Sequence, residues 1–122
     1  MTLDGLQVLG VEDEPVIALA LEDLLLDLGA TPTLAGNADE AFALTDRRGF
    51  DAAILDVNLH GVRSYALAER LLALAIPFIF ATGYGNATHP DRLRHVPTVT
   101  KPYDIGDIRD AFARLGVDGP TA

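Results

Sequence analysis

The chain has 122 residues, which is enough for one domain with a single hydrophobic core and too few for two. Hydrophobic residues make up 49% of it and there are no cysteines, which argues against disorder and excludes disulfides, thiolate catalysis and cysteine-ligated metals. A formal net charge of −9 disfavours binding to nucleic acid. The sequence shows no basic leader and no apolar run of roughly 18 residues, so we expect a cytoplasmic protein without a membrane partner.

Short apolar runs alternate with helical patterns along the chain. They predict five strands, at residues 6–11, 31–35, 51–56, 77–82 and 96–100. Helical spacing of apolar residues predicts four helices between and after them, at residues 15–28, 37–47, 64–75 and 104–115. Gly29 ends the first helix, and Asn37 with Glu40 forms a capping box at the start of the second.

The segment 83–95 stands where a further helix is due, but it contains two glycines and a proline. These residues disfavour a regular helix, so we expect a short or mobile one there. Alternating strands and helices predict an α/β protein with a doubly wound parallel sheet. We expect a flavodoxin-like (βα)5 fold with strand order 2-1-3-4-5.

Polar side chains follow four of the predicted strands at their carboxyl ends. They are Glu12, Asp13, Asp56, Thr82 and Lys101. Each has a structural explanation of its own, because acids favour helix starts, Asp forms turns, Thr suits strands and Lys is usually a surface charge. In an open parallel sheet, however, these strand ends meet at one edge, where ligands bind near the switch point between the first and third strands. The joint placement therefore predicts a functional site.

The chemistry of this site follows from its residue types. Three carboxylates without cysteine favour a hard cation such as Mg²⁺, with Mn²⁺ as an alternative ion. Asp56 can then be both a ligand and a nucleophile that forms an acyl phosphate. Lys101 and the Thr82 hydroxyl can contact the phosphoryl oxygens, and Gly83 leaves room for them.

Four ordered motifs carry a family resemblance. "VEDE", "LDVNLHG", "FATG" and "TKP" follow the first, third, fourth and fifth predicted strands, and together they resemble the receiver domain of two-component response regulators. The resemblance implies that Asp56 accepts phosphate from a histidine kinase and that Lys101 and Thr82 contact it. It implies Mg²⁺ ligation by Glu12, Asp13, Asp56 and the backbone carbonyl of Asn58. It also implies a cis peptide bond before Pro102.

The chain departs from the common receiver pattern in its switch residues. Thr98 stands three residues before the lysine, where receivers usually have an aromatic side chain. "PFIFATGYG" instead resembles the FAT GUY subgroup of stand-alone receivers, which work with kinases of the HWE or HisKA2 type. Tyr84 is then a candidate for part of the readout, and segment 83–95 is the element expected to reposition on phosphorylation.

We expect a single receiver domain over residues 1–122 with no output domain, acting by contact with a histidine kinase and with a phosphotransfer or other protein. It is predicted to be a signalling protein that catalyses only its own phosphorylation and dephosphorylation. The alternatives are a receiver excised from a hybrid kinase or larger regulator, and a phosphate-blind pseudo-receiver.

Two enzyme-like or cofactor-binding alternatives are disfavoured. A haloacid-dehalogenase-like phosphatase needs an acidic residue two positions after its nucleophile, and here that position is Asn58. A flavodoxin-like cofactor binder holds a phosphate after the first strand, where the acids of "EDEP" would repel it. His60, which stands where many receivers have proline, His89 and His95 are predicted to be unrelated to catalysis.

Overall fold

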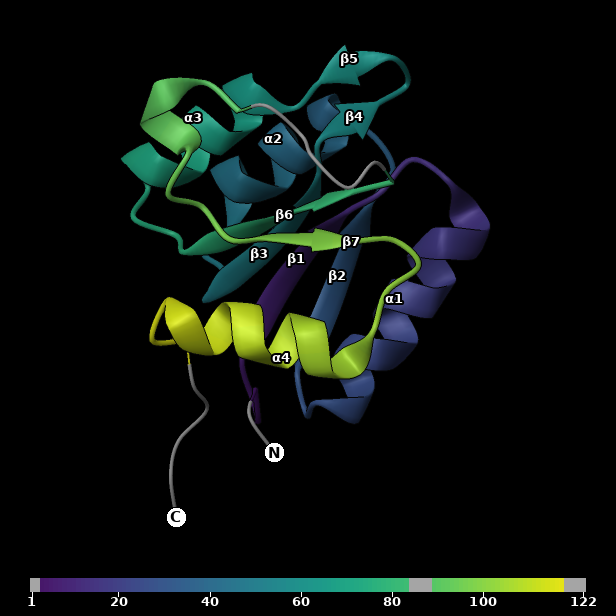
Figure 1. The fold of residues 1–122 in the computed structure, drawn as a ribbon. Helices are drawn as coiled ribbons and strands as arrows, with labels where there is room; N and C mark the ends of the chain where they lie inside the picture. The colour runs from purple at the N-terminus through teal and green to yellow at the C-terminus, as the bar shows by residue number, and fades with distance from the viewer. Residues whose placement is uncertain (1–2, 84–88, 118–122) are drawn as a thin grey trace.

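The computed structural model describes residues 3–83 and 89–117 (Figure 1). Its main sheet is parallel and has the order β2-β1-β3-β6-β7, with β1 (Gln7–Val11), β2 (Thr31–Ala35), β3 (Ala52–Asp56), β6 (Phe78–Thr82) and β7 (Thr98–Thr100). The helices are α1 (Pro15–Asp27), α2 (Ala38–Arg47), α3 (Tyr65–Ala73) and α4 (Ile105–Arg114). When only the strands of the main sheet are numbered along the chain, β6 is the fourth strand and β7 the fifth, and the order reads 2-1-3-4-5. The predicted α/β fold and strand order are therefore confirmed.

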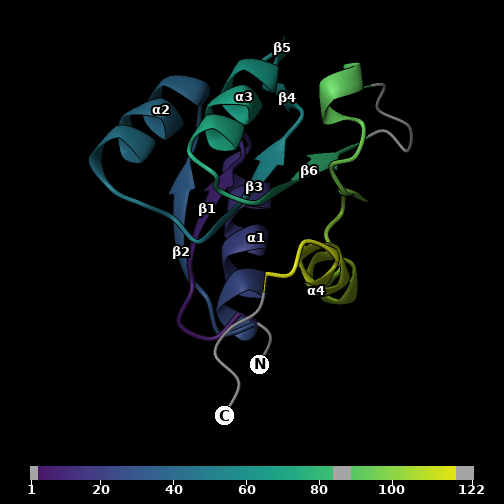
Figure 2. The ribbon, with the colours of Figure 1, turned by 90° about the vertical axis from the view of Figure 1, so that its left-hand side faces the viewer.

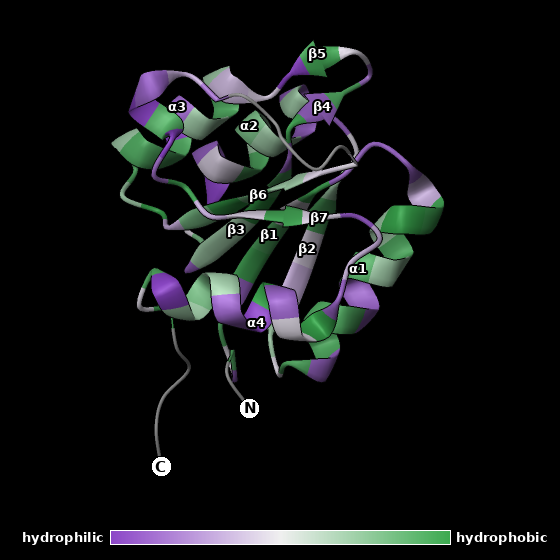
Figure 3. Ribbon diagram, in the orientation of Figure 1, coloured by the Kyte–Doolittle hydropathy of each residue, from purple (hydrophilic) through white to green (hydrophobic). Residues whose placement is uncertain are grey.

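The helices lie in two layers on opposite faces of the sheet (Figures 1 and 2). Leu67 and Leu71 of α3 pack with residues of α2 and one sheet face in a first buried cluster. Leu25 of α1 and Phe112 of α4 pack against the other face in a second. Figure 3 shows hydrophobic residues on the central strands and a mixture of hydrophobic and hydrophilic residues along the helices. Both faces of the sheet are therefore covered, which explains the nearly continuous apolar character of β3.

The start of α2 shows how local sequence sets an element. Asn37 Oδ1 accepts a 2.8 Å hydrogen bond from the backbone N–H of Glu40. The Glu40 carboxylate accepts a 3.2 Å bond from the backbone N–H of Gly36, one residue before the N-cap. The predicted capping box is therefore present with its return bond shifted by one residue.

The connection between β6 and β7 contains, within its described part, only the short 3-10 helix η1 (Asp91–Leu93). Leu93 is buried in the cluster beneath α2 and α3. The prediction of a short fourth helix agrees with this segment. Residues 84–88, which include Tyr84, lie outside the described residues.

Two details differ from the sequence-based prediction. The fifth strand is confined to β7, shorter than the predicted 96–100, because Pro97 has no N–H to donate to the sheet. A small antiparallel hairpin, formed by β4 (Asn58–Leu59) and β5 (Val62–Arg63), was not predicted. Across residues 3–83 and 89–117, no helix is long and apolar enough to cross a membrane.

Candidate functional site

Asp56 is the last residue of β3, and the residue is only 4% exposed. Its Oδ1 atom accepts a 3.2 Å hydrogen bond from the backbone N–H of Asn58. The Ser64 hydroxyl donates a 2.7 Å bond to the Asp56 carbonyl oxygen and so ties the strand end to the start of α3. A buried strand thus places Asp56 at the edge of the sheet, where one local hydrogen bond holds its carboxylate and another holds its backbone carbonyl.

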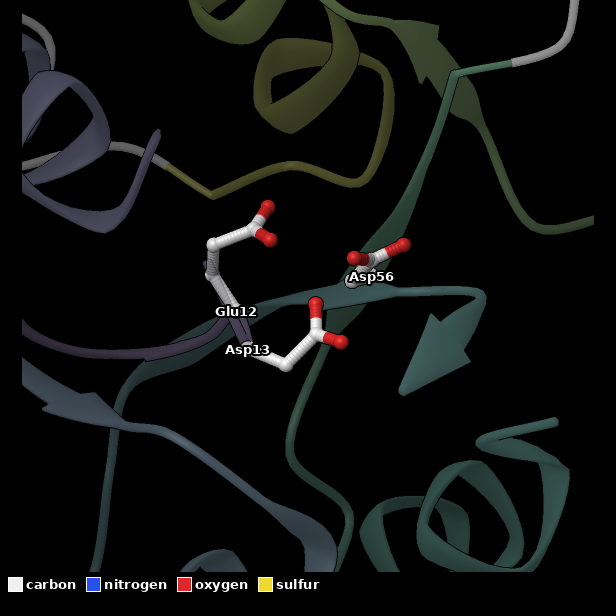
Figure 4. Close-up of side chains that lie close together, drawn as sticks. All are labelled: Glu12, Asp13 and Asp56. Atoms are coloured by element: carbon white, nitrogen blue, oxygen red, sulfur yellow. The ribbon is translucent and has the colours of Figure 1, made fainter. Parts of the chain in front are cut away.

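Glu12 and Asp13 follow β1, the neighbour of β3 in the sheet, and carry their carboxylates to the same edge (Figure 4). One ligand oxygen from each of the three acids lies within 4.8 Å of the others. Glu12 is 1% exposed, and Asp13 Oδ2 accepts a 2.8 Å hydrogen bond from the backbone N–H of His60. The structure therefore brings the predicted acidic ligands together, with the all-oxygen donor set that hard divalent cations prefer.

Lys101 supplies the positive charge in this cluster. Its Nζ atom lies 2.7 Å from Asp56 Oδ2 and 2.8 Å from Glu12 Oε1. Its backbone N–H donates a 2.8 Å bond to the carbonyl oxygen of Thr82, which links the ends of β6 and β7. The peptide bond between Lys101 and Pro102 is cis, as the family resemblance implied.

Burial raises the pKa of Asp56 to about 6, against the hydrogen bond from Lys101 and with help from the negative charge of Glu12. Burial alone would lower the pKa of Lys101, but its hydrogen bonds to the two carboxylates outweigh this and raise it. For Asp13, burial alone would raise the pKa. Hydrogen bonds to its carboxylate, chiefly from the backbone N–H of His60, outweigh burial and lower the pKa. The site therefore keeps Lys101 and Asp13 charged near neutral pH, while Asp56 titrates closest to it.

A pocket of about 590 Å³ opens at this edge of the sheet. The predicted site residues that line it are Asp13, Asp56, Asn58, Thr82, Gly83, Lys101 and Pro102. The Thr82 side chain is buried, and a Cβ atom added at Gly83 would meet no atom within 4 Å. Val16 and Ile17 of α1 add apolar lining. The pocket thus presents carboxylates, an ammonium group and a hydroxyl to a small ligand, with open space beside Gly83.

Thr98 does not share this pocket. It is half-buried on β7, and its Oγ1 atom lies 2.8 Å from Nε2 of His89. Tyr84, the other predicted switch residue, lies outside the described residues. The structure therefore gathers the predicted phosphate and metal residues and leaves Thr98 in a separate contact.

Sequence reasoning missed three residues that contact the site. The Tyr103 hydroxyl donates a 3.1 Å bond to Glu12 Oε1, and its position two residues after Lys101 is the one signal that pointed to it. Ser64 gave no signal, because a serine before a helix is by default an N-cap. The His60 contact to Asp13 is made by the backbone, and its imidazole Nδ1 lies farther away, at 3.6 Å from Asp13 Oδ2.

The fold and this site define a flavodoxin-like α/β domain with an acidic pocket at the carboxyl ends of β1 and β3. A family model described as the response regulator receiver domain matches residues 8–113, so the chain belongs to that family. The resemblance seen in the four sequence motifs is thereby confirmed. Receiver domains are signalling modules of two-component systems that receive phosphate from histidine kinases and bind Mg²⁺ at an acidic pocket.

Curated relatives match over most of this chain but only part of their own length. The transcriptional regulatory protein TcrA of Mycobacterium tuberculosis is 30% identical over 120 residues, which is 93% of this chain and 46% of TcrA. The probable transcriptional regulator ycf29 of Porphyra purpurea is 34% identical over 114 residues, 86% of this chain and 54% of the relative. The virulence sensor protein BvgS of Bordetella bronchiseptica is 35% identical over 81 residues, 66% of this chain and 6% of the sensor. The chain thus spans about half the length of the two regulators and a small part of the sensor.

Three solved structures match this chain over most of both chains. SdrG from Sphingomonas melonis Fr1 is 43% identical with a TM-score of 0.82, covering 96% of this chain and 100% of that one. A structure described as the BeF3-activated conformation of SdrG is 44% identical with a TM-score of 0.77, covering 89% of this chain and 94% of that one. The receiver domain of the PhyR response regulator from Erythrobacter litoralis is 27% identical with a TM-score of 0.75, covering 98% and 97%.

Proposed function

We propose that this protein is a single-domain response regulator whose Asp56 takes a phosphoryl group from a histidine kinase in a Mg²⁺-dependent reaction. One observation carries the proposal. Asp56 is a buried strand-end carboxylate that opens into the pocket, 2.7 Å from Lys101 and grouped with Glu12 and Asp13. A nucleophile, a cation for the phosphoryl group and a set of metal ligands are thus adjacent, which phosphoryl transfer requires.

The donor atoms fit a divalent cation. Glu12, Asp13, Asp56 and the backbone carbonyl of Asn58 would hold Mg²⁺, with Mn²⁺ as the alternative ion. Three carboxylates face one lysine in this cluster, so negative charge is in excess when all are ionised. The bound ion supplies charge neutralisation for an incoming phosphoryl group and favours the ionised form of Asp56.

The chain's own residues account for the transfer. A carboxylate oxygen of Asp56 attacks the phosphorus of a phosphohistidine, forming an O–P bond as the N–P bond breaks. The donor imidazole leaves with the bonding electron pair and takes up a proton from solvent. Lys101 donates to one phosphoryl oxygen and the Thr82 hydroxyl to another, while the open space beside Gly83 admits the group. Hydrolysis of the acyl phosphate by water resets Asp56, so the protein acts only on itself.

The subgroup and the partner form the finer part of the proposal. The FATGYG stretch and the similarity to SdrG and to the PhyR receiver domain support the FAT GUY subgroup of stand-alone receivers. The cognate kinase is then of the HWE or HisKA2 type, and Tyr84 contributes to the readout. The protein works in the cytoplasm and signals, or relays phosphate to a phosphotransfer protein, by direct contact.

The test is intact mass spectrometry after incubation with Mg²⁺ and acetyl phosphate. One added phosphoryl group is expected in the wild type and in Asp110→Asn, which changes an exposed acid on α4. No adduct is expected in Asp56→Asn or when EDTA removes the cation. An adduct that hydroxylamine removes identifies an acyl phosphate.

The outcomes separate the alternatives. If acetyl phosphate gives no adduct, transfer is measured from a phosphorylated HWE or HisKA2 histidine kinase. Failure of both donors would identify a phosphate-blind pseudo-receiver and overturn the proposal. The complete reading frame distinguishes a stand-alone regulator from a receiver domain excised from a hybrid kinase or larger regulator.

A further inference from the structure

His89 lies between β6, β7 and α3, with both ring nitrogens in hydrogen-bond contacts. Its Nδ1 atom is 3.1 Å from the Tyr65 hydroxyl, and its Nε2 atom is 2.8 Å from Thr98 Oγ1. The imidazole also lies over Phe80, with ring centroids 4.5 Å apart and an interplanar angle of 33°. We call Tyr65, His89 and Thr98 the His89 clasp. It joins the first residue of α3 to the first residue of β7 across the face of β6.

The hydrogen bonds of the clasp define the protonation state of its imidazole. The Thr98 hydroxyl is 3.4 Å from the carbonyl oxygen of Val96, to which it donates its proton. Thr98 Oγ1 therefore accepts from His89, which places the ring proton on Nε2. Nδ1 then carries a lone pair and accepts from the Tyr65 hydroxyl. In this pattern the imidazole is neutral and Nε2-protonated, and protonation of Nδ1 would remove the acceptor for the Tyr65 hydroxyl proton.

The electrostatic surroundings agree with a neutral ring. Burial lowers the pKa of His89, and the positive charge of Arg63 on β5 lowers it further. Tyr65 is the titratable group facing the ring from α3, whereas Phe80 and Thr98, which face it from β6 and β7, carry no charge. Arg63 also lines the pocket that contains Asp56. One side chain thus borders the pocket and acts electrostatically on His89.

The clasp is attached to both strands that carry the proposed phosphate contacts. Phe80 precedes Thr82 by two positions on β6, so the two side chains lie on the same face of the sheet. Thr98 begins β7, which leads to Lys101, and it pairs with Phe80 across the sheet. Movement of Thr82 or Lys101 toward a phosphoryl group would therefore shift the two strands between which His89 is held.

We propose that His89 is a positioning residue for the phosphorylation response: its neutral imidazole holds α3 to β7 while Asp56 is unmodified, and phosphorylation of Asp56 loosens this clasp. The inference rests on the proposed function, because it needs a phosphoryl group at Asp56. Two effects act in the same direction. Lys101 leaves Glu12 for the phosphoryl group and moves the end of β7, and the added negative charge draws Arg63 away from His89. The change then reaches the surface of α3 through Tyr65.

The experiment is NMR of the histidine rings in ¹⁵N-labelled protein, with and without Mg²⁺ and acetyl phosphate, beside intact mass spectra of the same samples. Unphosphorylated His89 is expected to carry its proton on Nε2 and to have a pKa below the ordinary value. Phosphorylation should shift its ring signals and raise its pKa, whereas His95, an exposed histidine with no ring contact to Phe80, serves as the internal control.

Variants separate a positioning role from a merely structural one. His89→Phe keeps a ring over Phe80 and loses both hydrogen bonds, and Tyr65→Phe loses only one. Both variants should become phosphorylated to the wild-type extent. The changes in amide chemical shift that phosphorylation causes along α3 should, however, be smaller than in the wild type by at least about half. Thr98→Val should alter the tautomer of His89. Thermal unfolding shows whether each variant folds. If His89→Phe does not fold, Tyr65→Phe alone is sufficient for the test.

Each outcome decides one question. A wild type with no phosphoryl adduct from acetyl phosphate or from a kinase overturns the proposed function, and this role of His89 with it. Where the adduct forms, three results would each overturn the role of His89 and leave the proposed function standing. They are unchanged His89 ring signals, an Nδ1-protonated ring, and wild-type shift changes along α3 in both variants. An adduct with shifted His89 signals and reduced α3 responses in the variants supports both.

Discussion

The Tyr103 hydroxyl donates a 3.1 Å hydrogen bond to Oε1 of Glu12, a residue 91 positions earlier in the chain. Burial and the negative charge of Glu12 raise the pKa of Tyr103, so its hydroxyl remains protonated at neutral pH and stays a donor. Lys101 contacts the same carboxylate oxygen, at 2.8 Å. Glu12 is thus oriented by two donors from the segment after β7, and Tyr103 is a positioning residue for a proposed metal ligand.

Replacing Tyr103 with phenylalanine should weaken Mg²⁺ binding. The change removes one of the two side-chain donors to Glu12 and leaves Lys101 and the backbone N–H of Glu14, and loss of such an outer contact typically costs about tenfold in metal affinity. NMR titration with Mg²⁺ measures the dissociation constant directly. Phosphorylation of Tyr103→Phe should be slow at low Mg²⁺ and recover at saturating Mg²⁺. Tyr65→Phe, which removes a hydroxyl from the His89 clasp, is the matched control, and equal affinities in the two variants would contradict this role.

Replacing Asp56 with asparagine should stabilise the protein at neutral pH and above in the absence of divalent cations. The folded-state pKa of Asp56 is about 6, above its ordinary value of 3.8, because burial disfavours the charged form. Stability from this group is therefore present below the unfolded pKa and is lost as the pH rises through the folded pKa. The loss amounts to roughly 2 to 3 kcal/mol at about 1.4 kcal/mol per pKa unit.

Chemical denaturation in EDTA between about pH 4 and pH 8 measures this effect. The difference in free energy of unfolding between Asp56→Asn and the wild type should grow as the pH rises. Mg²⁺ should shrink it at the upper end, because the cation favours the ionised carboxylate in the wild type. Parallel pH profiles for the two proteins would show that Asp56 ionises as easily in the folded state as in the unfolded one.

The main elements and the five strand-end residues could be predicted because their causes are local. Apolar runs and helical spacing identify the strands and helices, and the carboxyl ends of parallel strands share one edge of the sheet. Asp56 and Lys101 needed no more information than this to be placed together. The contacts of Tyr103 and His89 depend on where side chains distant in sequence meet in three dimensions, and no local pattern encodes that.

The β4–β5 hairpin was missed for a different reason. Its strands have two residues each, too few to show an alternating pattern. The turn between them places His60 at φ 52° and Gly61 at φ 81°, a left-handed conformation that glycine favours and that histidine tolerates less readily. Gly61 alone marked a turn in the sequence, whereas the hairpin depends also on the bond from the His60 N–H to Asp13.

Replacing Lys101 with methionine should make the protein more dependent on Mg²⁺ for its stability. Lys101 is the cation that contacts the buried carboxylates of Asp56 and Glu12, and methionine leaves both without it. The variant should be less stable than the wild type in EDTA, and Mg²⁺ should raise its melting temperature by more than it raises that of the wild type. Thermal unfolding with and without Mg²⁺ tests this, with Arg109→Met as a surface control; equal Mg²⁺ effects in the two variants would contradict it.

Replacing Ala75 with glycine should stabilise the fold without affecting the site. Ala75 follows α3, is exposed, and has φ 57°, a left-handed conformation that costs an L-residue about 1 to 2 kcal/mol. Glycine removes this cost but loses more backbone entropy on folding, so the net gain should be about 0.5 to 1 kcal/mol. Ala73, the last residue of α3, is also exposed but helical, so Ala73→Gly should lower stability by a similar amount. Chemical denaturation of the two variants should therefore give changes of opposite sign, while phosphorylation of Asp56 stays at the wild-type rate in both; a loss of stability in Ala75→Gly would show that the turn imposes no strain.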